Sequence, residues 1–361
     1  MPAANNNKIA IWVVTPNGIK IARRIAALRP YADTYLSVRL SEATGAILTF
    51  DKLSEELSQK FNRYAGHIFI MSTGIVVRVI APLITGKTTD PAVVVIDDQG
   101  QHAVSLLSGH LGGANALTLQ VAEIIGARPV ITTATDVNRR PAIDLLAKEK
   151  NMAIENPRAI KIVNMALLTD QKIFVHDQYG LLRDEIPNAI QLEGAVAIDT
   201  VLNAPGFSLD DHTAAIFVGD RQIEFSPNVL ILRPATLVAG IGCNRNTSME
   251  EIKDLLDEVL EKNQLAGACL KRIATIDLKA DEPGMVALAK DLNLPIELFS
   301  REQLNSVKDI QTPSTVVEKH VGVKSVCEAA AILGSQMGAL IVPKQTAPNV
   351  TVAIARKAFT S

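Results

Sequence analysis

Short apolar runs rich in β-branched residues alternate with runs of helical periodicity over the first third of the chain. The runs at 8–14, 67–71 and 129–135 predict strands, and those at 19–28 and 53–64 predict helices. Strands that alternate with helices indicate βαβ units, in which a helix connects two parallel strands. The N-terminal third is therefore expected to form an α/β domain around a largely parallel sheet.

Three further patterns refine this expectation. Residues 33–40 predict another strand, and residues 72–84 predict a helix that stops near Pro82. The runs 93–97 and 102–107, joined by the turn sequence DQGQ, predict a β-hairpin.

The last third repeats the alternation. Residues 236–242, 272–278, 295–299, 339–344 and 350–355 predict strands. The helices between them carry the Ser-x-x-Glu or Ser-x-x-Gln pattern of a capping box, in which two side chains satisfy backbone N–H groups reciprocally. These patterns are Ser248 to Glu251, Ser300 to Gln303, and Ser325 to Glu328.

The length of 361 residues exceeds the roughly 100–200 residues of one domain, so several domains are expected. We predict a multi-domain α/β protein with layered N-terminal and C-terminal domains and mostly parallel sheets. The predicted boundaries are 1–140, 141–234 and 235–361. The middle region is expected to be a smaller, proline-rich linking subdomain with strands at 172–177, 195–199, 214–219 and 229–233.

Charge and cysteine usage narrow the class of ligand and the compartment. The formal net charge is −2, which argues against a general nucleic-acid binder, whereas residues 1–140 carry a net +4 that suits an anionic small molecule. Three dispersed cysteines fit a reducing compartment. The N-terminus lacks a signal-peptide pattern, and the longest uncharged stretch, 99–122, is too polar to span a membrane. A cytoplasmic location is expected.

Glycine-rich loops at predicted strand–helix junctions are the main candidates for ligand binding. Free N–H groups and the helix dipole favour anions at a helix start. Two loops at the carboxyl ends of strands would form one ligand crevice in a parallel sheet. The candidate residues are Ser72, Thr73 and Gly74 in the first loop, Ser108, Gly109, Gly112, Gly113 and Asn115 in the second, and Gly240 and Gly242 in the C-terminal sequence GIGCNRN. For GIGCNRN, a tight strand–helix turn without a ligand is the alternative.

Titratable residues beside these loops are candidates for acid–base chemistry. His110 lies in the second loop, and Asp136 follows the strand predicted at 129–135. Lys279 and Glu282 lie in a C-terminal strand–helix loop, and Cys243 is a weaker candidate nucleophile. A histidine that bonds backbone, or an aspartate that caps a turn, is the structural alternative. No metal-ligand spacing, GxSxG, HExxH, P-loop or complete GxGxxG motif is present.

The sequence resembles the CbiG family, the cobalt-precorrin-5A hydrolases of the anaerobic cobalamin pathway. The N-terminal resemblance rests on HIFIMSTGIVVRVIAPLI, SLLSGHLGGANALTLQVA and PVITTATD. The C-terminal resemblance rests on VAGIGCNRNTS, IATIDLKADEPGMVALAKDL and VGVKSVCEAAAILGS. The middle region matches in position and length more than in motif.

The resemblance implies a hydrolase that opens the δ-lactone of cobalt-precorrin-5A and releases acetaldehyde to give cobalt-precorrin-5B. It implies no protein cofactor, since the substrate carries the cobalt, and neighbouring pathway methyltransferases as partners, with no nucleic acid and no membrane. His110 or Asp136 would act as the base, and N–H groups at Gly112–Gly113 or Ser72–Gly74 would stabilise the oxyanion.

The C-terminal third also resembles the stand-alone protein CobE, which suggests that hydrolysis belongs to the N-terminal region and tetrapyrrole binding to the C-terminal one. Two other functions remain open on the residues alone. One is a non-catalytic corrinoid carrier. The other is a dinucleotide-binding oxidoreductase that uses GIGCNRN, against which the missing third glycine counts.

Overall fold

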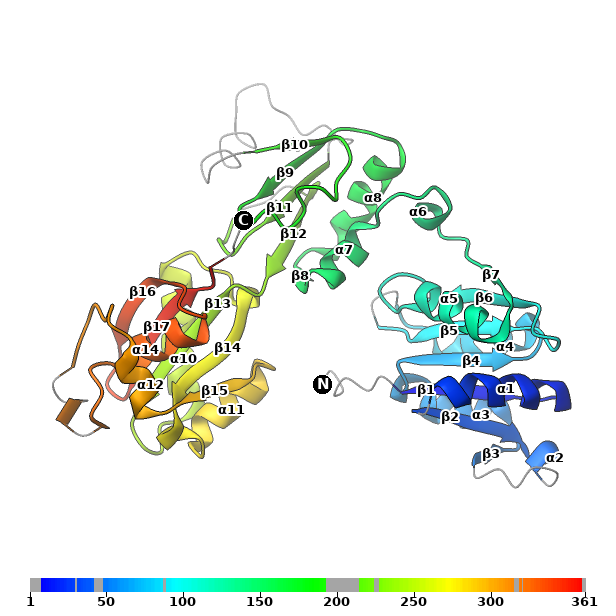
Figure 1. Ribbon diagram of the computed structural model, residues 1–361, viewed down its shortest axis with the longest axis horizontal. Coiled ribbons are helices and arrows are strands. Elements are labelled where there is room, and N and C mark those ends of the chain that lie inside the picture. Colours follow the sequence, from blue (N-terminus) through cyan, green and yellow to red (C-terminus); the bar gives the residue numbers. More distant parts are fainter. Residues whose placement is uncertain are drawn as a thin grey trace. The chain divides into compact units, whose positions relative to one another are not determined.

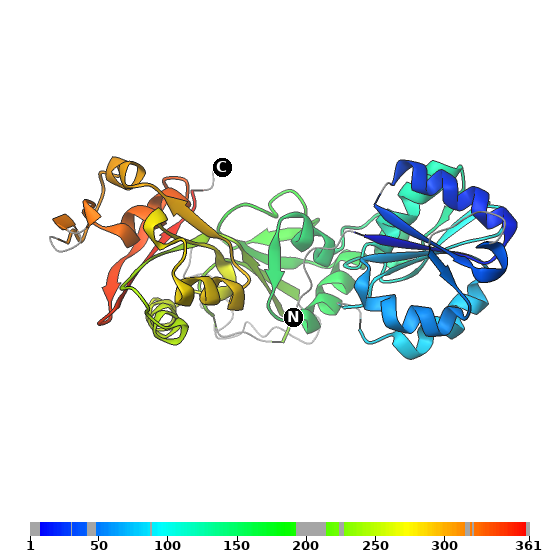
Figure 2. The same ribbon diagram turned by 90° about the horizontal axis from the view of Figure 1, so that it is seen from below.

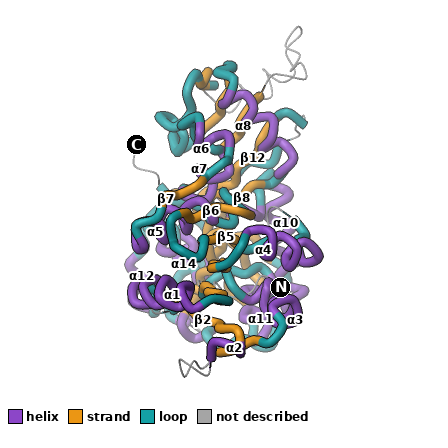
Figure 3. The backbone as a smooth tube through the Cα atoms, turned by 90° about the vertical axis from the view of Figure 1, so that its right-hand side faces the viewer, coloured by secondary structure: helices purple, strands orange, loops and turns teal. Residues whose placement is uncertain are grey.

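The computed structural model describes residues 8–29, 31–41, 48–86, 89–192, 214–223, 227–314, 318–319 and 321–358. Its internal contacts divide the chain into two units, Met1–Leu145 and Leu146–Ser361 (Figure 1). Each unit is built from strands that alternate with helices along the backbone (Figure 3). Within the described residues, no helix combines the length and apolarity needed to cross a membrane.

One seven-stranded sheet forms the centre of the first unit. Its strands are β1 (Ile9–Val13), β2 (Ala32–Ser37), β3 (Leu48–Phe50), β4 (Gly66–Ile70), β5 (Ala92–Ile96), β6 (His102–Leu107) and β7 (Arg128–Val130). Their order is β3-β2-β1-β4-β5-β6-β7. Every neighbouring pair is parallel except β5 and β6, which are antiparallel. The last two strands therefore run opposite to the first five.

Helices cover both faces of this sheet (Figure 2). They are α1 (Pro16–Leu28), α3 (Leu53–Lys60), α4 (Thr73–Ile80) and α5 (Ala114–Ile125). Because side chains alternate along a strand, Ile11 packs with residues of α1 and α5, whereas the adjacent Trp12 packs with residues of α3 and α4. Burial on both faces explains why β1, β4 and β5 are buried along their whole length and, apart from His67 in β4, do not alternate with polar residues.

Several local predictions for this unit can be compared with the structure. The hairpin is confirmed, because β5 and β6 pair antiparallel. The strand predicted at 33–40 ends at Ser37, where the short helix α2 (Val38–Ser41) begins, and the strand predicted at 129–135 ends at Val130. The helix predicted at 72–84 is α4 followed by a 3-10 turn at Ala81–Leu83, which contains Pro82.

The second unit begins with a five-stranded sheet. Its strands are β8 (Met152–Ile154), β9 (Ile173–Asp177), β10 (Ala189–Gln191), β11 (Ala214–Val218) and β12 (Val229–Pro234), in the order β10-β9-β11-β12-β8. All pairs are parallel except β12 with β8. The predicted strands at 172–177, 214–219 and 229–233 correspond to β9, β11 and β12, and the one at 195–199 lies outside the described residues. Helix α8 (Ile160–Leu168) packs against β9 and β11.

A second five-stranded sheet follows. Its strands are β13 (Leu237–Cys243), β14 (Leu270–Ile276), β15 (Ile296–Phe299), β16 (Ala339–Thr346) and β17 (Val350–Arg356), in the order β15-β14-β13-β17-β16. The first three are parallel, and β17 is antiparallel to both neighbours. One face packs against α10 (Met249–Lys262) and α11 (Pro283–Asp291), and the other against α12 (Arg301–Ser306) and α14 (Val326–Gly334).

A buried polar cluster joins these two sheets within the second unit. Asp220 follows β11 and is fully buried. Its carboxylate accepts hydrogen bonds from Arg356 Nε at 2.7 Å and Nη2 at 2.9 Å, and from Tyr179 Oη at 2.5 Å. Two charge-assisted bonds with fixed geometry at a buried site hold the end of β17 to the middle region. These contacts explain why residues 146–361 form one unit.

The three predicted capping boxes have different outcomes. Ser300 and Gln303 form a complete box at α12. Ser248 accepts from the N–H of Glu251 at α10, whereas the Glu251 carboxylate accepts from the Asn349 side chain instead. The box predicted at Ser325 and Glu328 is wrong. The fully buried Glu328 carboxylate instead accepts backbone N–H groups from residues 311, 312 and 344, because its helix packs beneath those segments.

Candidate active site

His110 and Asp136 meet at one edge of the N-terminal sheet. His110 lies in the loop between β6 and α5, and Asp136 lies in the short helix α6 (Ala134–Val137) that follows β7. Strands β6 and β7 are parallel to each other, so their carboxyl ends lie at the same edge. His110 Nε2 is 3.0 Å from Asp136 Oδ2 and 3.0 Å from the Thr135 hydroxyl. The two residues proposed as catalytic are therefore in direct contact.

A second carboxylate contacts the other ring nitrogen of His110. Asp144 Oδ2 lies 3.4 Å from His110 Nδ1 and belongs to helix α7 (Ile143–Glu149). Its side chain is only 9% exposed, against 18% for His110 and 34% for Asp136. The imidazole is thus held between a buried carboxylate and one that reaches the surface.

The orientation of Asp136 is fixed by further hydrogen bonds. Its Oδ2 atom accepts from Asn115 Nδ2 at 3.1 Å and from Thr133 Oγ1 at 2.5 Å. The Asn115 amide is itself oriented, because its Oδ1 accepts from Ser105 Oγ at 2.7 Å. All of these contacts use Oδ2, so the other oxygen of the exposed carboxylate, Oδ1, can face a ligand.

The two carboxylates stabilise the protonated form of the imidazole. The hydrogen bond with Asp144 is the largest cause that raises the pKa of His110, and Asp136 acts in the same direction. Partial burial opposes both effects without reversing them. The geometry thus favours an imidazolium, which would have a carboxylate beside each ring nitrogen.

The glycine-rich loop that carries His110 is tightly folded. Ser108 has φ 58° and Gly113 has φ 87°, both in the left-handed region. A Cβ on Gly112 would lie 2.3 Å from Ser108 Cβ, so only glycine fits there. The Gly113 N–H donates to the His110 carbonyl at 2.8 Å, which shapes the loop around His110. This bond engages the Gly113 N–H, so the predicted oxyanion hole cannot use that group as the structure stands, and the role of the Gly112 N–H stays a prediction.

Comparison with known protein families accounts for most of the chain between residues 55 and 355. The family model described as cobalamin synthesis G N-terminal matches residues 55–136, the cobalamin biosynthesis central region matches 141–234, and cobalamin synthesis G C-terminus matches 237–355. The chain belongs to the CbiG family. The resemblance seen in the sequence is thereby confirmed.

Relatives support the same assignment. A cobalt-precorrin-5A hydrolase of Salmonella typhimurium is 38% identical over 361 residues, which cover 98% of this chain and 99% of that protein. A protein of the same name from Priestia megaterium is 34% identical, with coverage of 98% and 96%. The protein CobE of a Sinorhizobium species is 32% identical over 123 residues, which cover 34% of this chain and 80% of that protein.

The first predicted loop of this CbiG-family chain, Ser72–Gly74, lies at the opposite edge of the sheet from His110. It follows β4 and opens α4 as predicted, but β6 runs against β4 and β5. The His110 loop therefore lies near the amino end of β5, and the Cβ position of Gly112 is 3.2 Å from the Asp90 carbonyl just before that strand. The prediction of one crevice shared by both loops is wrong, and the Ser72–Gly74 N–H groups cannot act at His110.

The glycines of the C-terminal sequence GIG are strand residues. Strand β13 runs through Gly240 and Gly242 to Cys243, and α10 begins only at Met249. A Cβ on Gly240 would lie 1.9 Å from the Cys327 carbonyl oxygen in α14. The prediction of an anion-binding turn at these glycines is therefore wrong, since Gly240 is required for the close packing of a helix on the strand.

The other C-terminal candidates hold loops together. Glu282 is fully buried and accepts from Lys279 Nζ at 3.0 Å and from the Asn246 N–H at 2.7 Å. These contacts join the loop before α11 to the loop before α10, and they favour the structural role for both residues. Burial raises the pKa of the Cys243 thiol, which weakens the hypothesis of a thiolate nucleophile.

Sequence reasoning did not identify Asp144 or the threonines of the site. Thr133 and Thr135 belong to the sequence TTATD that contains Asp136, so a local signal for them was present. Asp144 opens an ordinary short helix, and only the tertiary structure shows its contact with His110. Among the residues that the structure describes, no group of three or more His, Cys, Asp or Glu is arranged to hold a metal ion.

Proposed function

We propose that this chain is a cobalt-precorrin-5A hydrolase, which opens the δ-lactone of its substrate and releases acetaldehyde to give cobalt-precorrin-5B. The full-length similarity to two proteins of that name supports the reaction. The observation that supports its location is the contact of His110 with Asp136, because it combines a fixed carboxylate with an imidazole of raised pKa at an exposed edge.

Asp136 is the general base in this proposal. Its Oδ1 atom takes no part in the three contacts that hold Oδ2, and in this proposal it accepts a proton from the attacking water. His110 acts as a positioning residue, because the imidazolium and Asn115 hold the carboxylate in one orientation. Asp144 favours the protonated form of His110, because its hydrogen bond raises the His110 pKa.

The proposed reaction has two steps. In the first, water oxygen bonds to the lactone carbonyl carbon, its proton passes to Asp136, and the ring C–O bond breaks to give a carboxylate and a hydroxyl group. Asp136 then returns its proton to solvent. In the second step, Asp136 takes the hydroxyl proton, the C–C bond between the carbinol carbon and the macrocycle breaks, and acetaldehyde leaves. The electron pair of that bond passes to the electron-poor macrocycle, which then takes up a proton. One water is consumed and one acetaldehyde is formed.

The cofactor and partners follow from the substrate. Cobalt enters as part of the corrinoid, so this acid–base scheme calls for no metal held by the protein. A methyltransferase that accepts the product would be the neighbouring enzyme. We place the reaction in the cytoplasm, in line with the reducing environment suggested by three dispersed cysteines.

Anaerobic incubation with cobalt-precorrin-5A tests this function. Trapped acetaldehyde and the matching loss of corrinoid mass are expected for the wild type, and a fall of about 100-fold or more for Asp136→Asn. His102→Asn is the matched control, because His102 also contacts an aspartate on the same sheet but is 51% exposed. Corrinoid that is retained unchanged by the wild type would instead show a carrier.

A further inference from the structure

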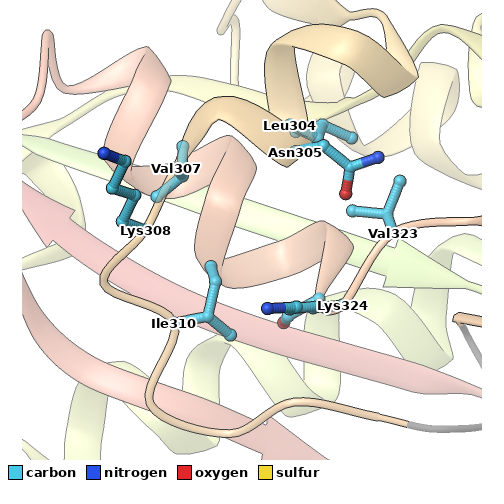
Figure 4. A pocket seen from close by; sticks show the side chains of 8 residues that line it. Leu304, Asn305, Val307, Lys308, Ile310, Val323 and Lys324 are labelled. Carbon is cyan, nitrogen blue, oxygen red and sulfur yellow. The ribbon is translucent and has the colours of Figure 1, made fainter.

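A small pocket opens on the C-terminal sheet domain, between α12 and the segment that leads into α14 (Figure 4). Its apolar walls come from Leu304, Val307 and Val323, each of which is at least 94% buried, and from Ile310. None of the residues that line it contributes to the His110 site. Its apolar lining suits a short aliphatic group.

The size of the pocket limits what it can hold. Its volume is about 180 Å³, similar to the cavity of about 150 Å³ that accommodates benzene in another protein. A complete tetrapyrrole is several times larger than this space, whereas one acetate or propionate side chain of a tetrapyrrole fits it. The macrocycle would remain outside while one arm enters.

The polar part of the lining is cationic. Lys308 and Lys324 line the pocket, and its lining contains no acidic residue. In the described part of the chain, neither lysine forms an ion pair. Figure 4 shows the Lys324 side chain directed toward Ile310 across the pocket, whereas the Lys308 ammonium lies at the outer rim. An anionic group would therefore meet Lys324 first.

A buried hydroxyl completes the polar end of the pocket. Ser325 is only 2% exposed and lines the pocket, although it stands at the N-cap position of α14. Its side chain does not make the usual capping bond and instead lies 3.7 Å from Cys327 Sγ, a weak partner. The hydroxyl can therefore donate to a carboxylate, and the positive end of the α14 dipole adds to the attraction.

We propose that this pocket binds one peripheral carboxylate arm of the tetrapyrrole substrate, with Lys324 and Ser325 on the carboxylate and the apolar walls on its methylene groups. This inference rests on the proposed function for the identity of the substrate. It assigns the C-terminal domain a defined subsite that is separate from the acid–base chemistry at His110.

The test measures binding by the full-length chain without turnover. Anaerobic ultrafiltration with cobalt-precorrin-5A is carried out in an Asp136→Asn background, and free corrinoid is read by absorbance. Lys324→Met is expected to raise Kd about tenfold, which corresponds to about 1.4 kcal/mol. Lys324→Arg should stay within about threefold because it keeps the charge. Lys290→Met, on the exposed side of α11, removes the same charge elsewhere in the domain and should leave Kd unchanged.

Steady-state acetaldehyde release with an otherwise wild-type chain gives the second readout. Lys324→Met should raise KM and leave kcat within about twofold, because the arm binds equally in the ground and transition states. Equal Kd values for Lys324→Met and Lys290→Met would overturn the proposal, as would a fall in kcat with KM unchanged. If the wild type releases no acetaldehyde, the proposed function fails, while the ultrafiltration comparison still decides whether the pocket binds the corrinoid.

Discussion

Replacement of Gly240 by alanine tests whether the GIG sequence serves packing rather than ligand binding. The new Cβ would lie 1.9 Å from the Cys327 carbonyl oxygen and 2.7 Å from the Ala331 nitrogen. Both are backbone atoms of α14, so the helix must move by more than 1 Å, roughly the shortfall from ordinary van der Waals contact. Overpacking a core in this way costs about 3 kcal/mol or more. Replacing glycine also lowers the conformational entropy of the unfolded chain, which stabilises the fold by less than about 1 kcal/mol and does not offset this cost.

Gly242→Ala is the matched control on the same strand. Its Cβ would approach the Thr351 hydroxyl at 2.8 Å, but a side-chain atom can rotate away, so a loss below about 1 kcal/mol is expected. Urea unfolding followed by circular dichroism measures the free energy of unfolding for both variants. Hydrogen exchange of the peptide over Val326–Gly334 localises the effect. Similar stability of the two variants, with unchanged exchange in α14, would refute the packing argument.

The remaining predictions concern the charge on His110. Asp144→Asn removes the largest cause that raises the pKa of His110, so the alkaline limb of the kcat/KM profile should move to lower pH, while His102→Asn should leave the profile unchanged. His110→Asn should destabilise the chain by about 1–2 kcal/mol at pH 6 and by less at pH 9. The sign follows because the folded chain raises the pKa of His110 above its value in the unfolded chain. The resulting stabilisation is complete below the unfolded-state pKa and is lost as the pH rises through the folded-state pKa. Urea unfolding at both pH values checks this, and a larger difference at pH 9 would contradict it.

The edge of the sheet at which the His110 loop lies was predictable from the sequence, but the prediction combined two correct patterns incorrectly. The hairpin at 93–107 already reverses β6, so the loop after β6 must lie opposite the loop after β4. The prediction assumed that both loops follow carboxyl ends of strands in one parallel sheet. It therefore placed Ser72–Gly74 beside His110. The contact of His110 with Asp136 was not visible at all, because it depends on the side-by-side pairing of β6 with β7.

Packing explains the other differences. A glycine that permits a turn and a glycine that permits a helix to approach a strand look identical in sequence, and only the distance from Gly240 to α14 separates them. Likewise, Glu328 occupies a correct position for a capping box. In the folded chain its buried carboxylate instead accepts hydrogen bonds from the backbone N–H groups of residues 311, 312 and 344. Local patterns located α10, α12 and α14, whereas the partners of their polar side chains were decided by tertiary contacts.

The candidate active site does not lie at the end of the sheet where doubly wound sheets most often bind ligands. It still lies at the carboxyl ends of two parallel strands, as the rule for such sheets requires. Ligands in such sheets bind outside the carboxyl ends of parallel strands, most often where the strand order reverses, which here is between β1 and β4. In this chain β6 and β7 form their own parallel pair, whose carboxyl ends lie at the other edge. His110 and Asp136 follow those two ends. The reversed pair therefore offers a second place for a ligand site, in addition to the carboxyl ends of β1 to β5. The parallel pairing of β6 with β7 thus brings the proposed base and its positioning residue together, and the antiparallel hairpin decides at which end of the sheet they lie.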